Sequence, residues 1–236
     1  MINAQDAKVV KGKKGFRFVK PELSKEEKRQ IALKRASELK SRISDYLEAK
    51  KSIPCGLELT EAFQENKARI LQLLGGKEED WVNWKWQMAN RITTVELLSQ
   101  IIPLTAEEQA QIEEVGKKYR WAISPYYASL MQRDNPLDPV RLQSVPSYLE
   151  LVPGGGKEDP MAEEFTSPAP CITRRYPDRL IINVTNVCGM YCRHCQRRRN
   201  IGETDRHAPL EAIEEALAYI RNNPEIRDVL ITGGDA

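Results

Sequence analysis

Two short apolar runs joined by one helical pattern restrict the fold of this chain more than any other feature. Residues 180–185 (Leu-Ile-Ile-Asn-Val-Thr) and 228–232 (Asp-Val-Leu-Ile-Thr) are rich in β-branched side chains, a pattern typical of strands buried on both faces. Between them, apolar residues recur at steps of three, four and three, at Leu210, Ile213, Leu217 and Ile220. Strand, crossover helix and strand form a βαβ unit, which predicts a parallel sheet and an α/β fold.

Composition divides the rest of the chain into segments. Residues 1–23 contain six Lys or Arg and no acid between positions 8 and 20, which predicts a flexible, solvated terminus or an arm that contacts a polyanion. Residues 24–124 form a helical region. Residues 125–177 hold nine of the 14 prolines and predict a segment that wraps around its neighbours, and residues 178–236 contain the βαβ unit.

Within the helical region, helices are expected at residues 24–50, 60–74, 81–88 and 105–120. Ser24 and Thr105 each begin a capping box, in which Glu follows three residues later. Gly75 and Gly76 should end the second helix. In the third, Trp81, Trp84 and Met88 share one face, and such an aromatic stripe is expected in the core rather than against a cofactor.

The overall composition excludes several classes of protein. With 41% apolar and 30% charged residues, the chain is globular rather than disordered or fibrous. It has no apolar run long enough for a transmembrane helix and no apolar core of a signal peptide near Met1, so we expect a cytoplasmic protein without a membrane partner. The net charge of +2 gives no reason to expect nucleic acid. Five cysteines in a reducing compartment favour a metal site over disulfides.

Cys188, Cys192 and Cys195 follow the first predicted strand. Three thiolates can converge on one centre when the backbone between them is a loop, but a closed zinc site needs four ligands. The set therefore suits a [4Fe-4S] cluster with one iron open to an outside ligand. A zinc site completed by His194 or His207 is the rival, and a role without metal is a third interpretation. Cys55 and Cys171, which follow prolines, are not expected to bind metal.

A C-x3-C-x2-C loop after one strand and Gly233-Gly234 after the next resemble the radical S-adenosylmethionine enzymes. More specific strings, over roughly residues 80–236, resemble the amino-acid 2,3-aminomutases: Trp84–Gln87, Ser124–Tyr127, Arg175–Arg179, Tyr191–Arg199 and Ile231–Ala236. Within that family, Gln196, the stretch 199–202 and the helical extension before Trp81 favour the glutamate type over the lysine type.

The resemblance implies the front part of a radical S-adenosylmethionine barrel, which is TIM-like, in a longer isomerase that moves the α-amino group of glutamate or lysine from C2 to C3. It implies three cofactors: a [4Fe-4S] cluster, S-adenosylmethionine and pyridoxal phosphate. The first two generate a radical that takes hydrogen from the substrate, while pyridoxal phosphate holds the migrating nitrogen. The implied partners are a free amino acid, an electron donor of the flavodoxin or ferredoxin type and, in the full protein, further copies of the chain.

The resemblance also assigns residues to each ligand. The cluster takes the three cysteines of the loop. The resemblance assigns the phosphate of pyridoxal phosphate to Arg175, Tyr176 and Arg179. The alternative is that Arg175 or Arg179 only forms an ion pair with Asp178. S-adenosylmethionine takes His194, Gly233, Gly234 and Asp235. Arg197 is expected to bind the substrate α-carboxylate, whereas Arg198 and Arg199 are expected to be solvated or to pair with Glu203 and Asp205.

Other interpretations stay open. One is a relative that modifies lysine in the β-lysylation of a translation factor, although the helical extension counts against it. Another is a zinc-stapled loop that binds nucleic acid through Arg193, Arg197, Arg198 and Arg199. The lysine that holds pyridoxal phosphate is expected after residue 236, because Lys157, despite its Gly-Gly-Gly context, precedes the first barrel strand. The chain alone is therefore expected to be inactive.

Overall fold

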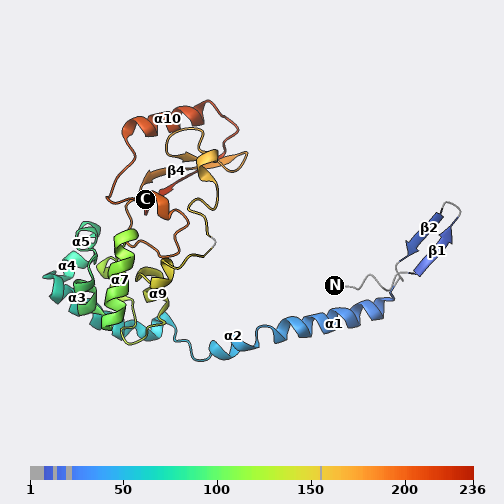
Figure 1. The fold of residues 1–236 in the computed structure, drawn as a ribbon, viewed down its shortest axis with the longest axis horizontal. Coiled ribbons are helices and arrows are strands. Elements are labelled where there is room, and N and C mark those ends of the chain that lie inside the picture. The colour runs from blue at the N-terminus through green and yellow to red at the C-terminus, as the bar shows by residue number, and fades with distance from the viewer. Residues whose placement is uncertain (1–7, 13–14, 20–22, 155) are drawn as a thin grey trace. The chain divides into compact units, whose positions relative to one another are not determined.

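A computed structural model describes residues 8–12, 15–19, 23–154 and 156–236. The chain separates into two compact units, Met1–Gly56 and Leu57–Ala236 (Figure 1). The division falls inside the region 24–124, which the sequence analysis groups as one. In the described part of the chain, no helix is both long enough and apolar enough to cross a membrane.

The first unit contains a hairpin and two helices. Strands β1 (Lys8–Gly12) and β2 (Gly15–Val19) pair antiparallel in the segment where the sequence predicts a flexible terminus. Residues 1–7, 13–14 and 20–22 of that segment lie outside the described residues, and its flexibility stays a prediction. The capping box at Ser24 is confirmed. The single long helix predicted over 24–50 is wrong, because the chain turns between α1 (Lys25–Ser41) and α2 (Ser44–Ala49). No described residue of either helix is buried.

The second unit begins with a helical layer, grouped at one end of this unit in Figure 1. The short helix η2 (Gly56–Leu59) begins at the last residue of the first unit. The layer itself consists of α3 (Thr60–Leu74), α4 (Glu78–Trp81), α5 (Trp84–Ala89), α6 (Val95–Ile101) and α7 (Ala106–Lys118). Two predicted helices are confirmed: α3 ends at Gly75 with φ of 66°, and α7 begins at the Thr105 capping box. The core of this layer includes Ile92, Leu98 and Ile112, each 2% exposed or less.

The predicted tryptophan helix is divided into α4 and α5. The Asn83 side chain accepts a hydrogen bond from the Lys85 amide and so starts a new helix after Trp81. Trp81 packs partly buried against the core, as expected, but Trp84 is 70% exposed. The core assignment is therefore wrong for Trp84, because the new helix start turns its side chain away from the interior.

The proline-rich segment contains short elements: α8 (Pro125–Ser129), α9 (Pro139–Ser144), η3 (Tyr148–Glu150), η4 (Glu163–Thr166) and β3 (Ile172–Thr173). Pro125 and Pro139 each occupy the first turn of a helix, where the missing amide of proline has no cost. Ser124 and Asp138 cap these two helices. Prolines therefore start elements here as well as interrupting them.

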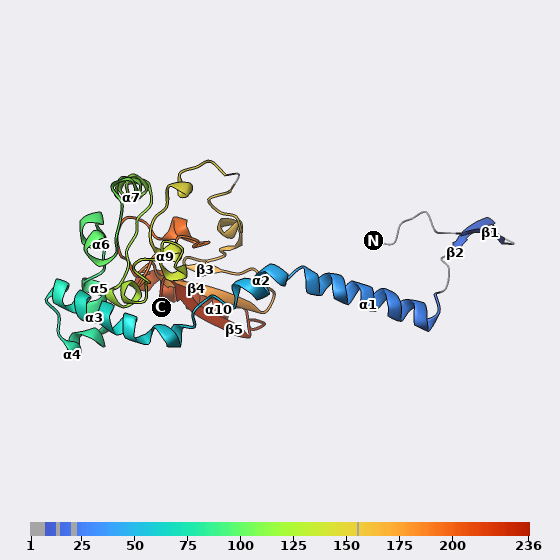
Figure 2. The ribbon, with the colours of Figure 1, turned by 90° about the horizontal axis from the view of Figure 1, so that it is seen from below.

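The predicted βαβ unit is confirmed. Strands β4 (Arg179–Thr185) and β5 (Asp228–Gly233) are parallel, with Ile182 opposite Ile231, and α10 (Leu210–Arg221) connects them (Figure 2). Leu180 and Ile182 of β4 pack with Ile213 and Ile220 of α10. No sequence pattern indicated that β3 pairs antiparallel with β4, which makes the sheet order β3-β4-β5.

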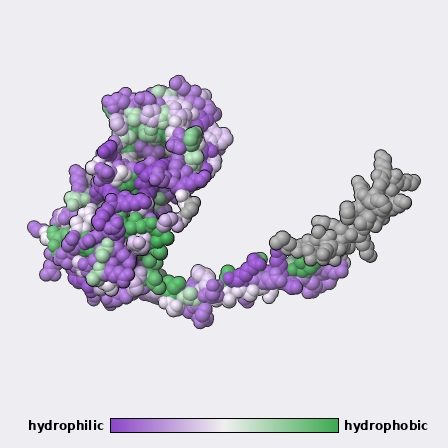
Figure 3. Space-filling model, in the orientation of Figure 1, coloured by the Kyte–Doolittle hydropathy of each residue, from purple (hydrophilic) through white to green (hydrophobic). Residues whose placement is uncertain are grey.

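Burial of the sheet differs from the prediction. Val229, Leu230 and Ile231 of β5 are 42%, 61% and 62% exposed, so the expectation of a strand buried on both faces is wrong for β5 in this structure. Within the described residues β5 is an edge strand, and green apolar patches reach the surface of this unit in Figure 3. Leu210 and Leu217 of α10 are likewise exposed. The mixed architecture is compatible with the α/β class, while the barrel stays a prediction.

The turn after β5 runs against the loop after β4. The Gly234 amide donates to the Thr185 carbonyl at 2.6 Å, and the Asp235 amide donates to the Val187 carbonyl at 2.8 Å. A Cβ atom on Gly233 would lie 2.1 Å from the Thr185 oxygen, and one on Gly234 would lie 2.2 Å from the Val187 oxygen. Two backbones approach so closely that neither position has room for a side chain.

Gly234→Ala should therefore destabilise the protein by about 2 kcal/mol, because the added methyl overpacks a contact that consists of backbone. Gly56→Ala is the control, since no atom lies within 4 Å of its added Cβ. Urea unfolding of the two variants measures the difference. Equal unfolding midpoints would contradict this account of the glycine turn.

Candidate functional site

The loop that carries the three cysteines, residues 186–197, is fixed by backbone hydrogen bonds on two sides. From the helical layer, the Ser124 amide donates to the Gly189 carbonyl at 2.8 Å, and the Tyr191 amide donates to the Ala122 carbonyl at 3.1 Å. From the sheet, the turn after β5 holds Val187. Parallel strands end at the same edge of a sheet, so the cysteine loop and the glycine turn meet there, as the sequence predicts.

The three thiols are half-buried and influence one another electrostatically. Burial raises the pKa of Cys188 to about 11, and negative charge at Cys195, Asp235 and Cys192 adds to the shift. Burial and the neighbouring Cys195 also raise the pKa of Cys192. Half-buried thiolates repel one another, and a soft metal centre would stabilise their negative charge.

The donor set thus fits an iron–sulfur cluster by its chemistry. Among the residues described, however, no three His, Cys, Asp or Glu side chains already stand in the geometry of a metal site. The assignment of Cys188, Cys192 and Cys195 as ligands stays a prediction. His194, offered both as a zinc ligand and as a contact for S-adenosylmethionine, has an exposed side chain.

A cleft of about 970 Å³ opens beside this loop, and we call it the aromatic cleft. Its lining includes apolar and aromatic side chains in or next to α4, α5 and α8: Trp81, Val82, Trp84, Met88, Tyr126 and Tyr127. It also includes Val187 and Gly189 of the cysteine loop and Asp235 of the glycine turn. Of the residues assigned to S-adenosylmethionine, the structure places Asp235 in this cleft, whereas Gly233 lines a polar cleft of about 380 Å³ with His207.

A second group of predicted residues meets in another cleft, of about 470 Å³, which we call the basic cleft. Its lining includes Arg175, Tyr176, Arg179 and Arg197, the two acids Glu163 and Asp228, and apolar residues of β4 and β5. The Arg179 guanidinium lies 5.3 Å from the centre of the Tyr176 ring. Arg175 and Arg197, 22 positions apart in the sequence, thus line one concave surface, which the sequence analysis did not foresee. Their assignment to a phosphate and a carboxylate stays a prediction.

The alternative pairing with Asp178 occurs for Arg179, with an ion pair of 3.3 Å. Both side chains are substantially exposed, so this pair contributes little and can yield to a ligand. None of the ion pairs found among the described residues involves Arg175. Arg197 pairs with Glu163 at 3.1 Å, while its Nε is buried and has no hydrogen-bond partner in the structure.

Arginines of the cysteine loop are neutralised by carboxylates of the segment 125–177. Arg193 donates two hydrogen bonds to Glu150, at 2.9 and 2.7 Å, and Arg198 pairs with the same carboxylate. Arg199 pairs with Asp159 and Glu163. The expected pairing of Arg198 and Arg199 with Glu203 and Asp205 is therefore wrong. Internal neutralisation also leaves little free charge for nucleic acid, which counts against the zinc-stapled binding module.

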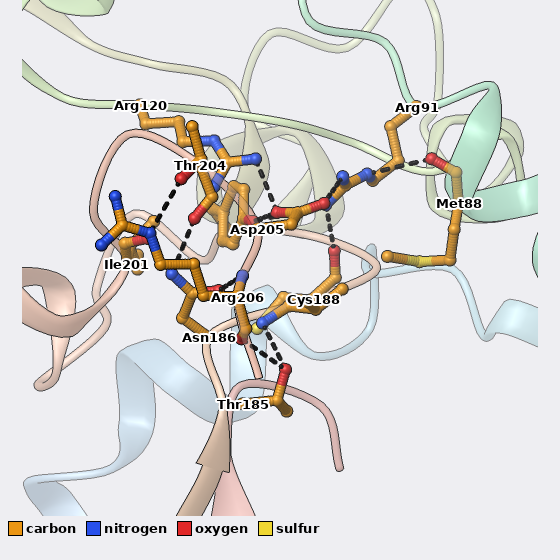
Figure 4. Close-up of polar contacts among 12 residues, drawn as sticks. Met88, Arg91, Arg120, Thr185, Asn186, Cys188, Ile201, Thr204, Asp205 and Arg206 are labelled. Atoms are coloured by element: carbon orange, nitrogen blue, oxygen red, sulfur yellow. Dashed lines mark hydrogen bonds and ion pairs between the residues drawn. The ribbon is translucent and has the colours of Figure 1, made fainter. Parts of the chain in front are cut away.

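A further cluster was missed by sequence reasoning. Asp205 accepts hydrogen bonds from Arg91, Arg120 and the Tyr191 hydroxyl, and Figure 4 shows it between the two arginines. Burial alone would raise the pKa of Asp205, but these bonds and the charge of Arg91 lower it to about 2. The partners lie 114 and 85 residues away, so no local pattern could have indicated them.

The Glu150–Arg193 pair predicts a dependence of stability on pH. Burial acts to raise the pKa of Glu150, but hydrogen bonds from Arg193 and the Ser147 amide outweigh it and lower the pKa below its usual 4.5. A lowered pKa stabilises the folded state above the unfolded value, and that contribution is lost as pH falls through the folded pKa. The unfolding free energy should thus decline as pH falls below about 4.5.

Glu150→Gln should cost roughly 3 kcal/mol at neutral pH, because it leaves the Arg193 charge buried without a counterion, and the cost should shrink in acid. Glu113→Gln, at an exposed position of α7, is the matched control. Denaturant unfolding at a series of pH values measures both. A cost for Glu150→Gln that stayed constant down to pH 3 would contradict the assignment.

Comparisons with known proteins agree with the resemblance. No family model matches the chain. It is 58% identical over 210 residues to glutamate 2,3-aminomutase of Clostridioides difficile, which covers 89% of this chain and 50% of that protein. L-lysine 2,3-aminomutase of Clostridium subterminale is 50% identical over 160 residues, which are 67% of this chain and 38% of that protein. The L-lysine 2,3-aminomutase of Bacillus subtilis is 46% identical over 159 residues, which are 67% of this chain and 34% of that protein.

The chain thus spans half or less of the length of these three relatives. The proteins it matches are named as aminomutases, which are isomerases. Identities of 46% to 58% over such lengths establish common descent. Over most of its length, this chain is homologous to the amino-acid 2,3-aminomutases.

Proposed function

We propose that this chain carries the cluster loop and part of the cofactor and substrate sites of a radical S-adenosylmethionine 2,3-aminomutase that depends on pyridoxal phosphate. The observation that carries the proposal is the 58% identity over 210 residues to a glutamate 2,3-aminomutase. The structure is compatible with it: Arg175, Tyr176, Arg179 and Arg197 line the basic cleft, and Asp235 lines the aromatic cleft beside the cysteine loop.

In the cluster loop, Cys188, Cys192 and Cys195 would hold a [4Fe-4S] cluster, which together with S-adenosylmethionine supplies a carbon radical that takes hydrogen from the substrate. The chain's own contribution is to hold the loop in place through its backbone hydrogen bonds. Aromatic side chains wall the adjacent cleft, and the Asp235 carboxylate offers a counterion for an ammonium group there. The same region carries the two glycines that fix the position of Asp235.

In the basic cleft, Arg175, Tyr176 and Arg179 would bind the phosphate of pyridoxal phosphate, which when bound assists the migration of nitrogen from C2 to C3. Two guanidinium groups and a phenol match the charge and the acceptors of a phosphate. Arg197, which lines the same cleft, would bind the α-carboxylate of the amino acid through its guanidinium group. Lys157 is exposed and lines neither cleft, which supports a different lysine, beyond residue 236, as the attachment point.

We favour glutamate over lysine as the substrate. The glutamate enzyme is matched over more of the chain than the lysine enzymes are, 89% against 67%, and at higher identity. A free amino acid and a one-electron donor of the flavodoxin or ferredoxin type are the proposed partners. The chain alone is proposed to be inactive, because these two clefts contain no lysine for pyridoxal phosphate.

The cluster is tested by anaerobic reconstitution of this chain with iron and sulfide. Cys192→Ala should lose the cluster, seen as loss of bound iron, of sulfide and of the broad visible absorption, because three protein thiolates are needed. Cys55→Ala is the control and should retain the wild-type content. A cluster retained in full by Cys192→Ala would contradict the ligand assignment, and zinc without sulfide would favour the rival site.

The reaction is tested with the full chain expressed from its gene and loaded with all three cofactors. L-Glutamate should be converted to its 3-amino isomer, followed by NMR. Arg197→Lys keeps the charge but loses the planar fork, so we expect KM for the amino acid to rise by about tenfold or more. An unchanged KM would remove Arg197 from the site, and preferential conversion of L-lysine would overturn the proposed substrate.

A further inference from the structure

The side chains of Asp205, Arg91, Arg120 and Tyr191, which we call the Asp205 cluster, connect three separate parts of the second unit. Arg91 follows α5, Arg120 follows α7, and Asp205 lies in the loop between the cysteines and α10. The three side chains meet at Tyr191, whose hydroxyl donates to Asp205 at 2.6 Å. The Arg91 and Arg120 guanidinium groups lie 5.7 and 4.8 Å from the centre of the Tyr191 ring. Tyr191 itself is 1% exposed and directly precedes Cys192.

Arg91 also reaches the backbone of the cysteine loop. Its Nη1 donates to the Cys188 carbonyl at 2.9 Å and to the Tyr191 hydroxyl at 3.3 Å, while its Nη2 donates to Asp205 (Figure 4). One guanidinium therefore links the first cysteine, the residue before the second and the carboxylate. The Asp205 cluster therefore contacts the loop at Cys188 itself and at Tyr191, the residue directly before Cys192.

The segment that carries Asp205 is itself tied to the start of the cysteine loop. The Asn186 side chain donates to the carbonyls of Ile201 and Thr204, at 2.7 and 2.9 Å, and accepts from the Arg206 amide at 2.6 Å. Figure 4 shows these bonds below Asp205. Asp205 is thus presented by a rigid turn whose position is set two residues before Cys188.

A carboxylate is required at this place for an electrostatic reason. The Arg91 and Arg120 side chains are only 11% and 24% exposed, and they approach the same tyrosine ring. Two desolvated cations so close together repel unless an anion lies between them. Nη1 of Arg120 is already buried without a hydrogen-bond partner in the structure, so the pairing with Asp205 carries much of the compensation.

We propose that Asp205 is a positioning residue for the proposed [4Fe-4S] cluster. By bridging Arg91 and Arg120 across Tyr191, it holds Cys188 and Cys192 in place for the metal. This rests on the proposed function for the identity of the metal centre. The positioning itself concerns the protein before any cluster is bound, so the two can fail separately.

The first test measures access to the thiols in the metal-free chain. Asp205→Asn keeps the shape of the side chain and removes its charge, so opening of the loop should become easier and alkylation of Cys188 and Cys192 by iodoacetamide should accelerate about tenfold. The rate for each cysteine is read by mass spectrometry. Glu225→Gln is the matched control, since it removes a carboxylate that pairs with Arg174 in the same unit. Its rates should stay within twofold of wild type.

The second measurement distinguishes an effect of the Asp205 charge from an effect of its packing. In the reconstituted protein, Asp205→Asn removes one negative charge near the cluster, so the reduction potential should shift in the positive direction, whereas Glu225→Gln should not move it. Should Asp205→Asn fail to fold by circular dichroism, Arg91→Lys replaces it. That variant keeps the charge but loses the fork that joins Cys188 to Asp205, and its thiols should also react faster.

Wild-type alkylation rates and an unchanged potential in a folded Asp205→Asn protein would overturn the inference, even with the cluster present. Faster alkylation in Asp205→Asn but not in Glu225→Gln would support the positioning of the loop. If the wild-type chain at the same time bound no iron–sulfur cluster, the proposed metal centre would be refuted while the positioning role stood. Equal acceleration in Glu225→Gln would also overturn it, because the effect would then be general loosening of the unit.

Discussion

The loop after β4 depends on being held by backbone from two directions at once. Hydrogen bonds from residues 122–124 fix it to the helical layer, and hydrogen bonds from the turn after β5 fix it to the sheet. The loop adds two buried side chains of its own, Met190 and Tyr191, to these backbone bonds. The proposed metal binding by the three cysteines depends on that double attachment.

Charge pairing completes what the backbone begins. Glu150, Asp159 and Glu163 come from the proline-rich segment and neutralise arginines that lie between and after the cysteines, among them Arg193 and Arg199. Asp205 does the same for arginines of the helical layer. The proline-rich segment therefore supplies the counterions that allow a strongly basic loop to fold against the protein. Of these arginines, Arg120 and Arg197 each keep one buried nitrogen without a hydrogen-bond partner, and Arg197 lines the basic cleft.

Local patterns predicted the parts of this fold whose causes are local. The capping boxes at Ser24 and Thr105, the glycine end of α3 and the βαβ unit are all confirmed, because capping and periodicity act within a few residues. The break between α4 and α5, the exposure of Trp84 and the antiparallel β3 were not predicted. Each depends on a competing cap or on a partner elsewhere in the chain.

For the site, the sequence by itself determined the chemistry: three thiols at close spacing, an Arg-Tyr-Pro-Asp-Arg string and a glycine pair after the second strand. It also determined that the cysteines and glycines meet, because parallel strands end at one edge of a sheet. Only the tertiary structure decided that the arginines are paired with Glu150 and Glu163, that Arg197 joins Tyr176 in one cleft, and that Asp205 bridges residues 85 and 114 positions away. Such pairings are set by packing, which local sequence does not encode.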